Sequence, residues 1–194
     1  MKVAVIDIGT NTFNLLIASK PRNRLVLDKV TKEFVFLGKG GINKNIIQED
    51  AIVRAITTLK EFKALCLEYK VDSIHAIATS AVRNASNKLS FVQKVFDETS
   101  IEIQIINGDT EAKFIYEGAR ESLDFEAEPI LLMDIGGGST EFSICNNQRI
   151  FWKRSFEIGA ARLFEEYQKS DQITKSEIEE IEHHIANTLL PLFN

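Results

Sequence analysis

The fold is decided by the segment Leu131-Leu132-Met133-Asp134-Ile135-Gly136-Gly137-Gly138-Ser139-Thr140-Glu141-Phe142. Its apolar beginning, Pro129 to Met133, predicts a buried strand that is covered on both faces. The three glycines predict a tight turn whose backbone N–H groups can approach a ligand, because no Cβ atom stands in the way. Two hydroxyls follow the turn, and a carboxylate flanks it on each side. This combination suits a phosphate group with a divalent cation, although a glycine-rich hairpin that merely reverses the chain is the alternative.

A second copy of the pattern stands near the N-terminus, as Val3-Ala4-Val5-Ile6-Asp7-Ile8-Gly9-Thr10-Asn11-Thr12-Phe13. Aligning the copies pairs the two aspartates, the first glycines, and Thr12 with Ser139. Bringing the two phenylalanines into line as well would require extra residues in the second copy. Both copies continue as strand, turn and strand, and a repeated unit of this length is a signal of the whole fold. We expect two such units to face each other across a cleft and to hold one phosphate group.

This duplication resembles the actin, sugar-kinase and heat-shock-chaperone ATPase superfamily. The resemblance implies an α/β fold with ribonuclease-H-like duplicated lobes. An acid-rich linker from Glu121 to Glu128 predicts a first lobe over residues 1–124 and a second over residues 125–194. The second lobe is short by comparison, so we expect it to be incomplete and leave open whether these residues act alone.

The composition is that of soluble globular material, with 194 residues, 44% hydrophobic and 26% charged. No apolar stretch approaches the roughly 18 residues of a membrane span, and a strand pattern stands where a signal peptide would. We therefore expect a cytoplasmic protein with no membrane partner. The net charge of −5 gives no reason to expect general nucleic-acid binding. Cys66 and Cys145 lack a CxxC partner and are predicted to be core residues.

Two further segments carry candidate site residues. A predicted strand ends in Ala78-Thr-Ser-Ala-Val-Arg83, followed by a helix near Ser86 or Asn87. Small and hydroxyl residues at a strand end are typical of a ligand-facing loop, although Arg83 on a solvated surface loop is the alternative. Another helix opens at Asn107-Gly-Asp-Thr-Glu111, with Asp109 or Thr110 as N-cap and Glu111 in the first turn. The helix dipole favours the ionised form of an acid there, which is also common for stability alone.

The three histidines are predicted not to bind metal. His183 and His184 are adjacent on a predicted helix, so they point in different directions and do not form the i, i+4 pair of a two-histidine site. His75 stands alone in a predicted strand.

Four stretches in order resemble the exopolyphosphatase and guanosine pentaphosphate phosphohydrolase family, Ppx/GppA. They are Asp7–Thr12, Ala78–Arg83 with Ala85 and Asn87, Ile106–Ala112, and Asp134–Glu141. The resemblance covers essentially the whole chain, and Ser155 to Leu163 is also similar to a family segment. Thr110 departs from the family pattern, which has two successive glutamates, the first at the position of Thr110 and the second at that of Glu111.

The resemblance implies a role for each candidate residue. Glu111 would orient the attacking water, and Mg²⁺ would be the cofactor. The metal-side acids would be Asp134 and Glu141, with Asp7 as a third. The phosphate-binding residues would be Thr10, Asn11, Thr12, Arg83, Gly137, Gly138, Ser139 and Thr140.

The implied function is hydrolysis of a terminal phosphoanhydride bond, releasing phosphate from inorganic polyphosphate or guanosine pentaphosphate. Such a reaction needs an in-line water, an acid to orient it, and positive charge on the phosphate oxygens. Two alternatives are a kinase of the same superfamily and a noncatalytic nucleotide- or polyphosphate-sensing module. The sequence does not choose between the two substrates, and it leaves the oligomeric state open, a homodimer included.

Overall fold

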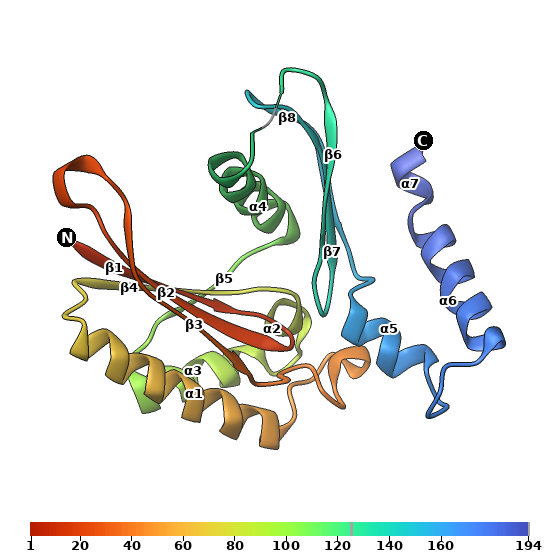
Figure 1. The fold of residues 1–194 in the computed structure, drawn as a ribbon. Helices are drawn as coiled ribbons and strands as arrows, with labels where there is room; N and C mark the ends of the chain where they lie inside the picture. Colours follow the sequence, from red (N-terminus) through yellow and green to blue (C-terminus); the bar gives the residue numbers. More distant parts are fainter. Residues whose placement is uncertain (125, 194) are drawn as a thin grey trace. The chain divides into compact units, whose positions relative to one another are not determined.

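The duplicated pattern forms two sheets of different size in a computed structural model, which describes residues 1–124 and 126–193 (Figure 1). The chain divides into two compact units, Met1–Ile106 and Asn107–Asn194. The predicted lobe boundary between residues 124 and 125 differs from this division by one helix, α4 (Gly108–Ser122), which packs on the second sheet. Residues 125 and 194, the two ends of the predicted second lobe, lie outside the described residues.

The first unit contains a five-stranded sheet in the order β3-β2-β1-β4-β5. Its strands are β1 (Lys2–Ile8), β2 (Thr12–Ser19), β3 (Val26–Phe34), β4 (Ser73–Ala78) and β5 (Ile103–Ile105). β1 to β3 form an antiparallel meander, whereas β4 and β5 run parallel to β1. The helices are α1 (Glu49–Glu68), α2 (Ser80–Asn84) and α3 (Lys88–Thr99), with 3₁₀ turns at Pro21–Asn23 and Ile42–Lys44. α1 and α3 lie along the same face of the sheet (Figure 1).

The core of the first unit lies between that face and α1. Apolar residues at three- and four-residue steps line the buried side of α1, among them Ile52, Leu59, Phe62 and Cys66. Each large side chain buried in this way contributes roughly 1.5–3 kcal/mol. The apolar stripe of α1 thus forms part of the core of the first unit. Burial also raises the pKa of the Cys66 thiol, as expected of a core cysteine.

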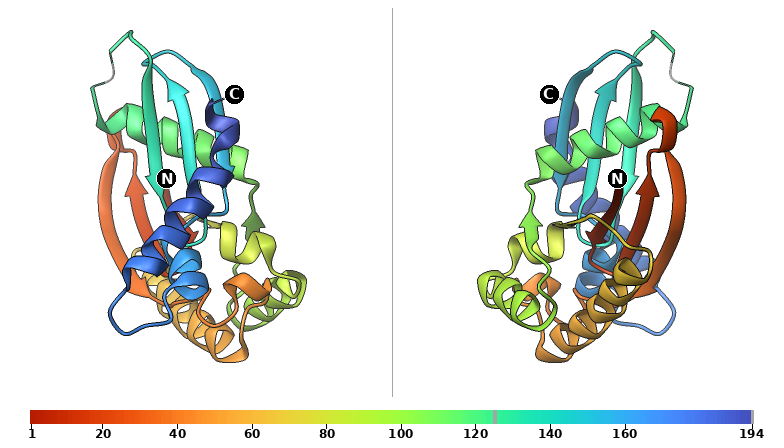
Figure 2. Two further views of the ribbon diagram at one scale, coloured as in Figure 1. Left: turned by 90° about the vertical axis from the view of Figure 1, so that its right-hand side faces the viewer. Right: turned by 90° about the vertical axis from the view of Figure 1, so that its left-hand side faces the viewer.

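The second unit is built on a three-stranded antiparallel sheet in the order β6-β7-β8. Its elements are α4, β6 (Ile130–Ile135), β7 (Thr140–Cys145), β8 (Ile150–Phe156), α5 (Ala160–Tyr167), α6 (Lys175–Thr188) and α7 (Leu190–Phe193). α4 packs on β7 and β8 (Figures 1 and 2). Ile185 of α6 and Leu189, the residue after that helix, pack with Phe142 and Phe156. These two phenylalanines lie on the face of the sheet opposite to Glu141 and Ser155, because side chains alternate along a strand.

The two hairpins have turns of equal length. In the first, the N–H of Gly9 donates to the carbonyl of Thr12 at 3.1 Å, and in the second the N–H of Gly136 donates to the carbonyl of Ser139 at 3.0 Å. The second copy therefore needs no extra residue, and the predicted alignment of the two phenylalanines is wrong. The sequence alignment matched two phenylalanines, whereas backbone hydrogen bonds fix the register.

This register shows which residues are counterparts. Asp7 pairs across the hairpin with Asn14, and Asp134 pairs with Glu141. In the first hairpin the Asn14 amide donates to the Asp7 carboxylate at 3.0 Å. The duplicated position opposite the aspartate thus holds a neutral amide in one unit and a second acid in the other.

The prediction that the segment before the glycines is buried on both faces is wrong. Leu131, Met133 and Ile135 are 56%, 51% and 61% exposed. Their counterparts in β1, Ala4, Ile6 and Ile8, are completely buried. The reason is position: β1 lies between two neighbouring strands, whereas β6 is an edge strand that pairs, among the described residues, with β7 alone.

Candidate active site

The glycine turn of the second hairpin is fixed by the beginning of α5. The N–H groups of Ala160 and Ala161 donate to the carbonyls of Gly136 and Gly137 at 2.9 and 2.8 Å, and the N–H of Gly159 donates to the carbonyl of Gly138 at 3.2 Å. These bonds fix the orientation of the peptide groups in the turn.

Three of the N–H groups in the described turn lack an acceptor, whereas that of Gly136 donates to Ser139. Among the described residues, the N–H groups of Gly137, Gly138 and Ser139 make no hydrogen bond within the protein. Ser139 is 2% exposed, and an unpaired N–H at a buried residue is costly. Consecutive N–H groups of this kind form an anion-binding nest, so the turn can bind a phosphate group.

The first hairpin repeats this arrangement with other partners. The carbonyl of Thr10 accepts from the N–H of Gly38 at 3.0 Å, and that of Asn11 accepts from Val35 and Phe36 at 2.9 and 2.8 Å. The N–H groups of Thr10 and Asn11 have no acceptor within residues 1–124 and 126–193. In both predicted phosphate-binding turns, neighbouring segments donate hydrogen bonds to the carbonyl groups, and consecutive N–H groups are left to bind a ligand.

Arg83 lies at the same end of the first sheet as this turn. β1 and β4 are parallel, and the N–H of Thr79 donates to the carbonyl of Ile8 at 3.3 Å, which holds the beginning of α2 beside the end of β1. The segment predicted as a loop is the helix α2, and Arg83 is in its last turn. Its guanidinium is half-buried and donates a long hydrogen bond of 3.5 Å to the carbonyl of Ile106.

Glu111 lies in the first turn of α4, as predicted. The N-cap is Asn107, not Asp109 or Thr110, because the Asn107 side chain accepts from the N–H of Thr110 at 2.8 Å. Ala112 and Tyr116 bury one side of the helix against the sheet, and Glu111 beside them is half-buried. A carboxylate in this first turn is stabilised in its ionised form by the helix dipole.

Asp134 and Glu141 lie side by side on neighbouring strands. They are cross-strand partners, so their side chains point to the same face of the second sheet. Asp134 is exposed, whereas Glu141 is 3% exposed and accepts from the Ser155 hydroxyl at 2.7 Å. Two carboxylates on one face of a sheet offer the oxygen ligands that Mg²⁺ takes in proteins.

The second unit thus brings together six of the predicted residues. These are Asp134, Gly137, Gly138, Ser139, Thr140 and Glu141, and the same unit also contains Glu111 on α4. Asp7, Thr10, Asn11, Thr12 and Arg83 belong to the first unit. No group of three or more His, Cys, Asp or Glu side chains that could hold a metal occurs among the described residues. Two carboxylates are enough for Mg²⁺, which keeps most of its waters, so Asp134 and Glu141 fit that ion.

Sequence reasoning missed several residues that build this site. Gly159 and Gly108 were not singled out, although a Cβ atom at Gly159 would stand 2.5 Å from the Gly137 carbonyl carbon and one at Gly108 would stand 2.4 Å from the Ser155 Cβ. Ser155 was part of the family-like segment without a role. A glycine at the start of a predicted helix, as Gly159 and Gly108 are, is a signal of close packing. The sequence does not show which residue such a glycine packs against.

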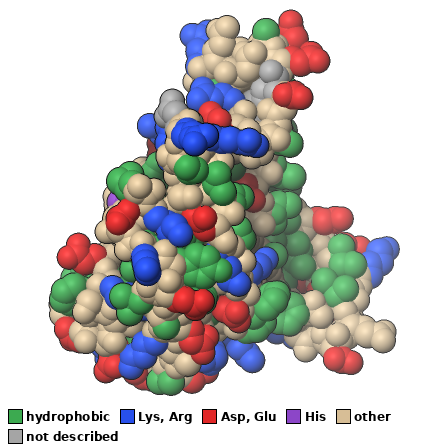
Figure 3. All heavy atoms as spheres, turned by 60° about the vertical axis from the view of Figure 1, so that its left-hand side comes forward, with side chains coloured by type: hydrophobic (Ala, Val, Ile, Leu, Met, Phe, Trp, Pro, Cys, Tyr) green, Lys and Arg blue, Asp and Glu red, His purple; other side chains and the backbone are tan. Residues whose placement is uncertain are grey.

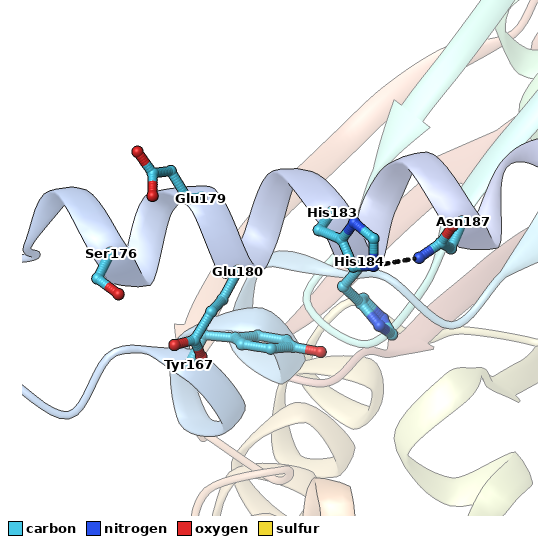
Figure 4. Close-up of a pocket in the computed structure, with 7 residues that line it drawn as sticks. All are labelled: Tyr167, Ser176, Glu179, Glu180, His183, His184 and Asn187. Atoms are coloured by element: carbon cyan, nitrogen blue, oxygen red, sulfur yellow. Dashed lines mark hydrogen bonds between the residues drawn. The ribbon is translucent and has the colours of Figure 1, made fainter.

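A separate pocket of about 460 Å³ lies between α5 and α6 (Figure 4). Its lining consists of Tyr167, Ser176, Glu179, Glu180, His183, His184 and Asn187. His183 and Asn187 contact each other at 2.9 Å, and the rings of Tyr167 and His184 lie 5.3 Å apart. Burial, followed by the charges of Glu166 and Glu180, raises the pKa of Tyr167. The pocket contains none of the predicted site residues.

Charged side chains of both signs are interspersed on the face drawn in Figure 3, with apolar patches between them. None of the helices in the described part of the chain has the length and apolar character needed to cross a bilayer.

The sequence of the chain is similar to a family of phosphatases and to individual relatives. A model of the Ppx/GppA phosphatase family matches residues 17–194. Over 173 residues the chain is 42% identical to the bifunctional 3-dehydroquinate synthase/phosphatase of Fusobacterium nucleatum, a match that covers 84% of this chain and 26% of that protein. It is 30% identical over 172 residues to exopolyphosphatase 1 of Mycobacterium tuberculosis, covering 88% of this chain and 50% of that protein.

A solved structure agrees closely with the fold. The crystal structure of an exopolyphosphatase from Cytophaga hutchinsonii superposes with a TM-score of 0.96 at 40% identity, covering 99% of this chain and 62% of that one. The predicted α/β fold with a duplicated strand-turn-strand unit is confirmed. The chain spans half or less of the length of the two curated relatives above.

Proposed function

This chain belongs to the Ppx/GppA phosphatase family, and from that premise we propose that it carries the reacting groups of a Mg²⁺-dependent phosphohydrolase. The reaction is release of terminal phosphate from inorganic polyphosphate, from guanosine pentaphosphate, or from both. The relatives from Mycobacterium tuberculosis and Cytophaga hutchinsonii are exopolyphosphatases by name, which supports polyphosphate as a substrate.

One observation carries this proposal. The Gly137–Ser139 turn offers three consecutive N–H groups without acceptors, and its carbonyls are held by α5. Donors that are fixed before the substrate arrives need no reorganisation when negative charge develops, which is the basis of electrostatic stabilisation of a phosphoryl transition state.

The other candidate residues would activate the water, bind the metal ion and bind further phosphate oxygens. Glu111 accepts a proton from, and orients, the water that attacks phosphorus. Asp134 and Glu141 would hold Mg²⁺, with Asp7 as a third acid, and the bound ion would offset charge on the phosphate oxygens. Thr10, Asn11, Thr12 and Arg83 bind further phosphate oxygens through backbone N–H groups, hydroxyls and the guanidinium.

The test compares Glu111→Gln with Glu117→Gln in the full polypeptide that contains residues 1–194. Both acids are on α4, but Glu117 is a surface residue whose carboxylate lies 3.6 Å from Lys113. We expect Glu111→Gln to lower phosphate release by about 10²–10⁴-fold with polyphosphate binding kept, as general-base catalysis contributes on that scale. Glu117→Gln should behave as the unmodified protein.

Undiminished release by Glu111→Gln would contradict the assigned role. Binding of polyphosphate with no release by the unmodified protein under excess Mg²⁺ would favour the sensing module. Consumption of ATP only in the presence of an acceptor would favour a kinase.

A further inference from the structure

Ser155 of β8 contacts Glu141 on β7 and also the beginning of α4, the helix that contains Glu111. Its hydroxyl donates to Oε1 of Glu141 at 2.7 Å. Its side chain also packs against the first residue of α4, since a Cβ atom built on Gly108 would stand 2.4 Å from the Cβ and 2.8 Å from the Oγ of Ser155. Glu111 follows Gly108 by three residues, within the first turn of the same helix.

Two other contacts hold α4 to the same strand region. The ammonium of Lys153, on the same face of β8 as Ser155, donates to the carbonyl of Asp109. At the other end of the buried face, the Tyr116 hydroxyl donates to the carbonyl of Asn146 at 3.0 Å, next to the turn between β7 and β8. The first turn of α4 is therefore placed by β8, and Ser155 is the residue of β8 that also contacts Glu141.

We propose that Ser155 is a positioning residue that fixes Glu141 for Mg²⁺ and keeps it in register with the first turn of α4. This inference rests on the proposed function. Glu141 has three rotatable side-chain bonds, and one short hydrogen bond to a buried carboxylate selects a single arrangement. Hydrogen bonds to a ligating carboxylate from outside the coordination shell change metal affinity about 10–100-fold when they are removed.

The experiment measures Mn²⁺ binding by electron paramagnetic resonance, with Mn²⁺ as the probe for the Mg²⁺ site. We expect Ser155→Ala to weaken Mn²⁺ binding about tenfold. Ser143→Ala is the matched control, because Ser143 is also buried and lies on the same face of the sheet, two residues from Glu141 on β7. Its Mn²⁺ affinity should equal that of the unmodified protein.

Phosphate release gives the second readout. We expect Ser155→Ala to need about tenfold more Mg²⁺ for half-maximal rate and to regain most of the rate at saturating Mg²⁺. A loss of fold would not be relieved by Mg²⁺ in this way. Ser155→Cys keeps one heavy atom on Cβ but replaces the hydroxyl with a larger, weaker hydrogen-bond donor, so it should also bind Mn²⁺ more weakly.

The outcomes separate the inference from the proposed function. If the unmodified protein binds Mn²⁺ and Ser155→Ala and Ser155→Cys bind it equally well, the role of Ser155 is overturned and the proposed function stands. If the unmodified protein binds no Mn²⁺ and releases phosphate without a divalent cation, both are overturned.

Discussion

Gly159 lies so close to Gly137 that a Cβ atom on Gly159 would stand 2.5 Å from the Gly137 carbonyl oxygen. This approach lets the first N–H groups of α5 reach the carbonyls of the glycine turn. The conformation of the anion-binding turn therefore depends on Gly159, which lies outside the turn and about twenty residues further along the chain.

Gly159→Ala should displace α5 from the turn. We expect it to lower the free energy of unfolding by about 1–3 kcal/mol, as overpacking does, and to abolish most phosphate release. Gly118→Ala is the control, because a Cβ atom there meets nothing within 4 Å and alanine favours the helix by roughly 0.5–1 kcal/mol. Chemical denaturation and phosphate release check both; full activity of Gly159→Ala would show that the turn does not depend on α5.

Gly108→Ala should be destabilising in a way that a second substitution relieves. Its new Cβ atom would overlap the Cβ of Ser155 at 2.4 Å, so α4 or β8 must shift. We expect a loss of about 1–3 kcal/mol in the single variant. Adding Ser155→Gly removes the atoms in the way and should recover part of that loss, measured by thermal unfolding. Additive losses in the double variant would contradict the contact.

Glu177 should make the second unit sensitive to acid. Its carboxylate accepts from the N–H groups of Thr174, Lys169 and Ser170 at 2.7, 2.7 and 2.9 Å and from the Thr174 hydroxyl at 2.9 Å. These bonds, led by that from the Thr174 N–H, lower the pKa of Glu177 from 4.5 to about 2. This arrangement includes a capping box, in which the N–H of Glu177 also donates to the Thr174 hydroxyl.

Because the folded-state pKa is lowered, this stabilisation is complete above about pH 4.5 and is lost as the pH falls towards 2. Glu177→Gln should remove that part of the pH dependence, whereas Glu182→Gln, an exposed acid on the same helix, should keep it. Denaturation followed by fluorescence of Trp152, which packs in the core of the second unit, measures the difference. Parallel pH profiles for the two variants would contradict the prediction.

A lysine introduced at equivalent positions of β6 and β1 should have different effects on stability. Met133 is 51% exposed on the edge strand β6, whereas its counterpart Ile6 is fully buried. We expect Met133→Lys in the 194-residue chain to leave the melting temperature nearly unchanged and to reduce self-association, because a lysine on an edge strand disfavours pairing with another chain. Ile6→Lys should unfold the first unit, because an unpaired charge would be buried. Thermal unfolding and size-exclusion chromatography check both; unfolding by Met133→Lys would show that β6 is covered.

The sequence by itself determined the features that depend on local spacing. The duplicated hairpins, the apolar stripe of α1, Glu111 in the first turn of its helix and the Thr174–Glu177 capping box were all predictable, because each follows from residues within a few positions of one another.

Only the tertiary structure decided which neighbour each element has. The edge position of β6, the attachment of α4 to β8, the contact between Gly159 and the glycine turn, and the hydrogen bond from Ser155 to Glu141 join residues that are distant in the chain. A local pattern specifies backbone conformation and which face is apolar, but it carries no information about which partner covers that face. That depends on long-range pairing and close packing, which form only when the whole chain folds.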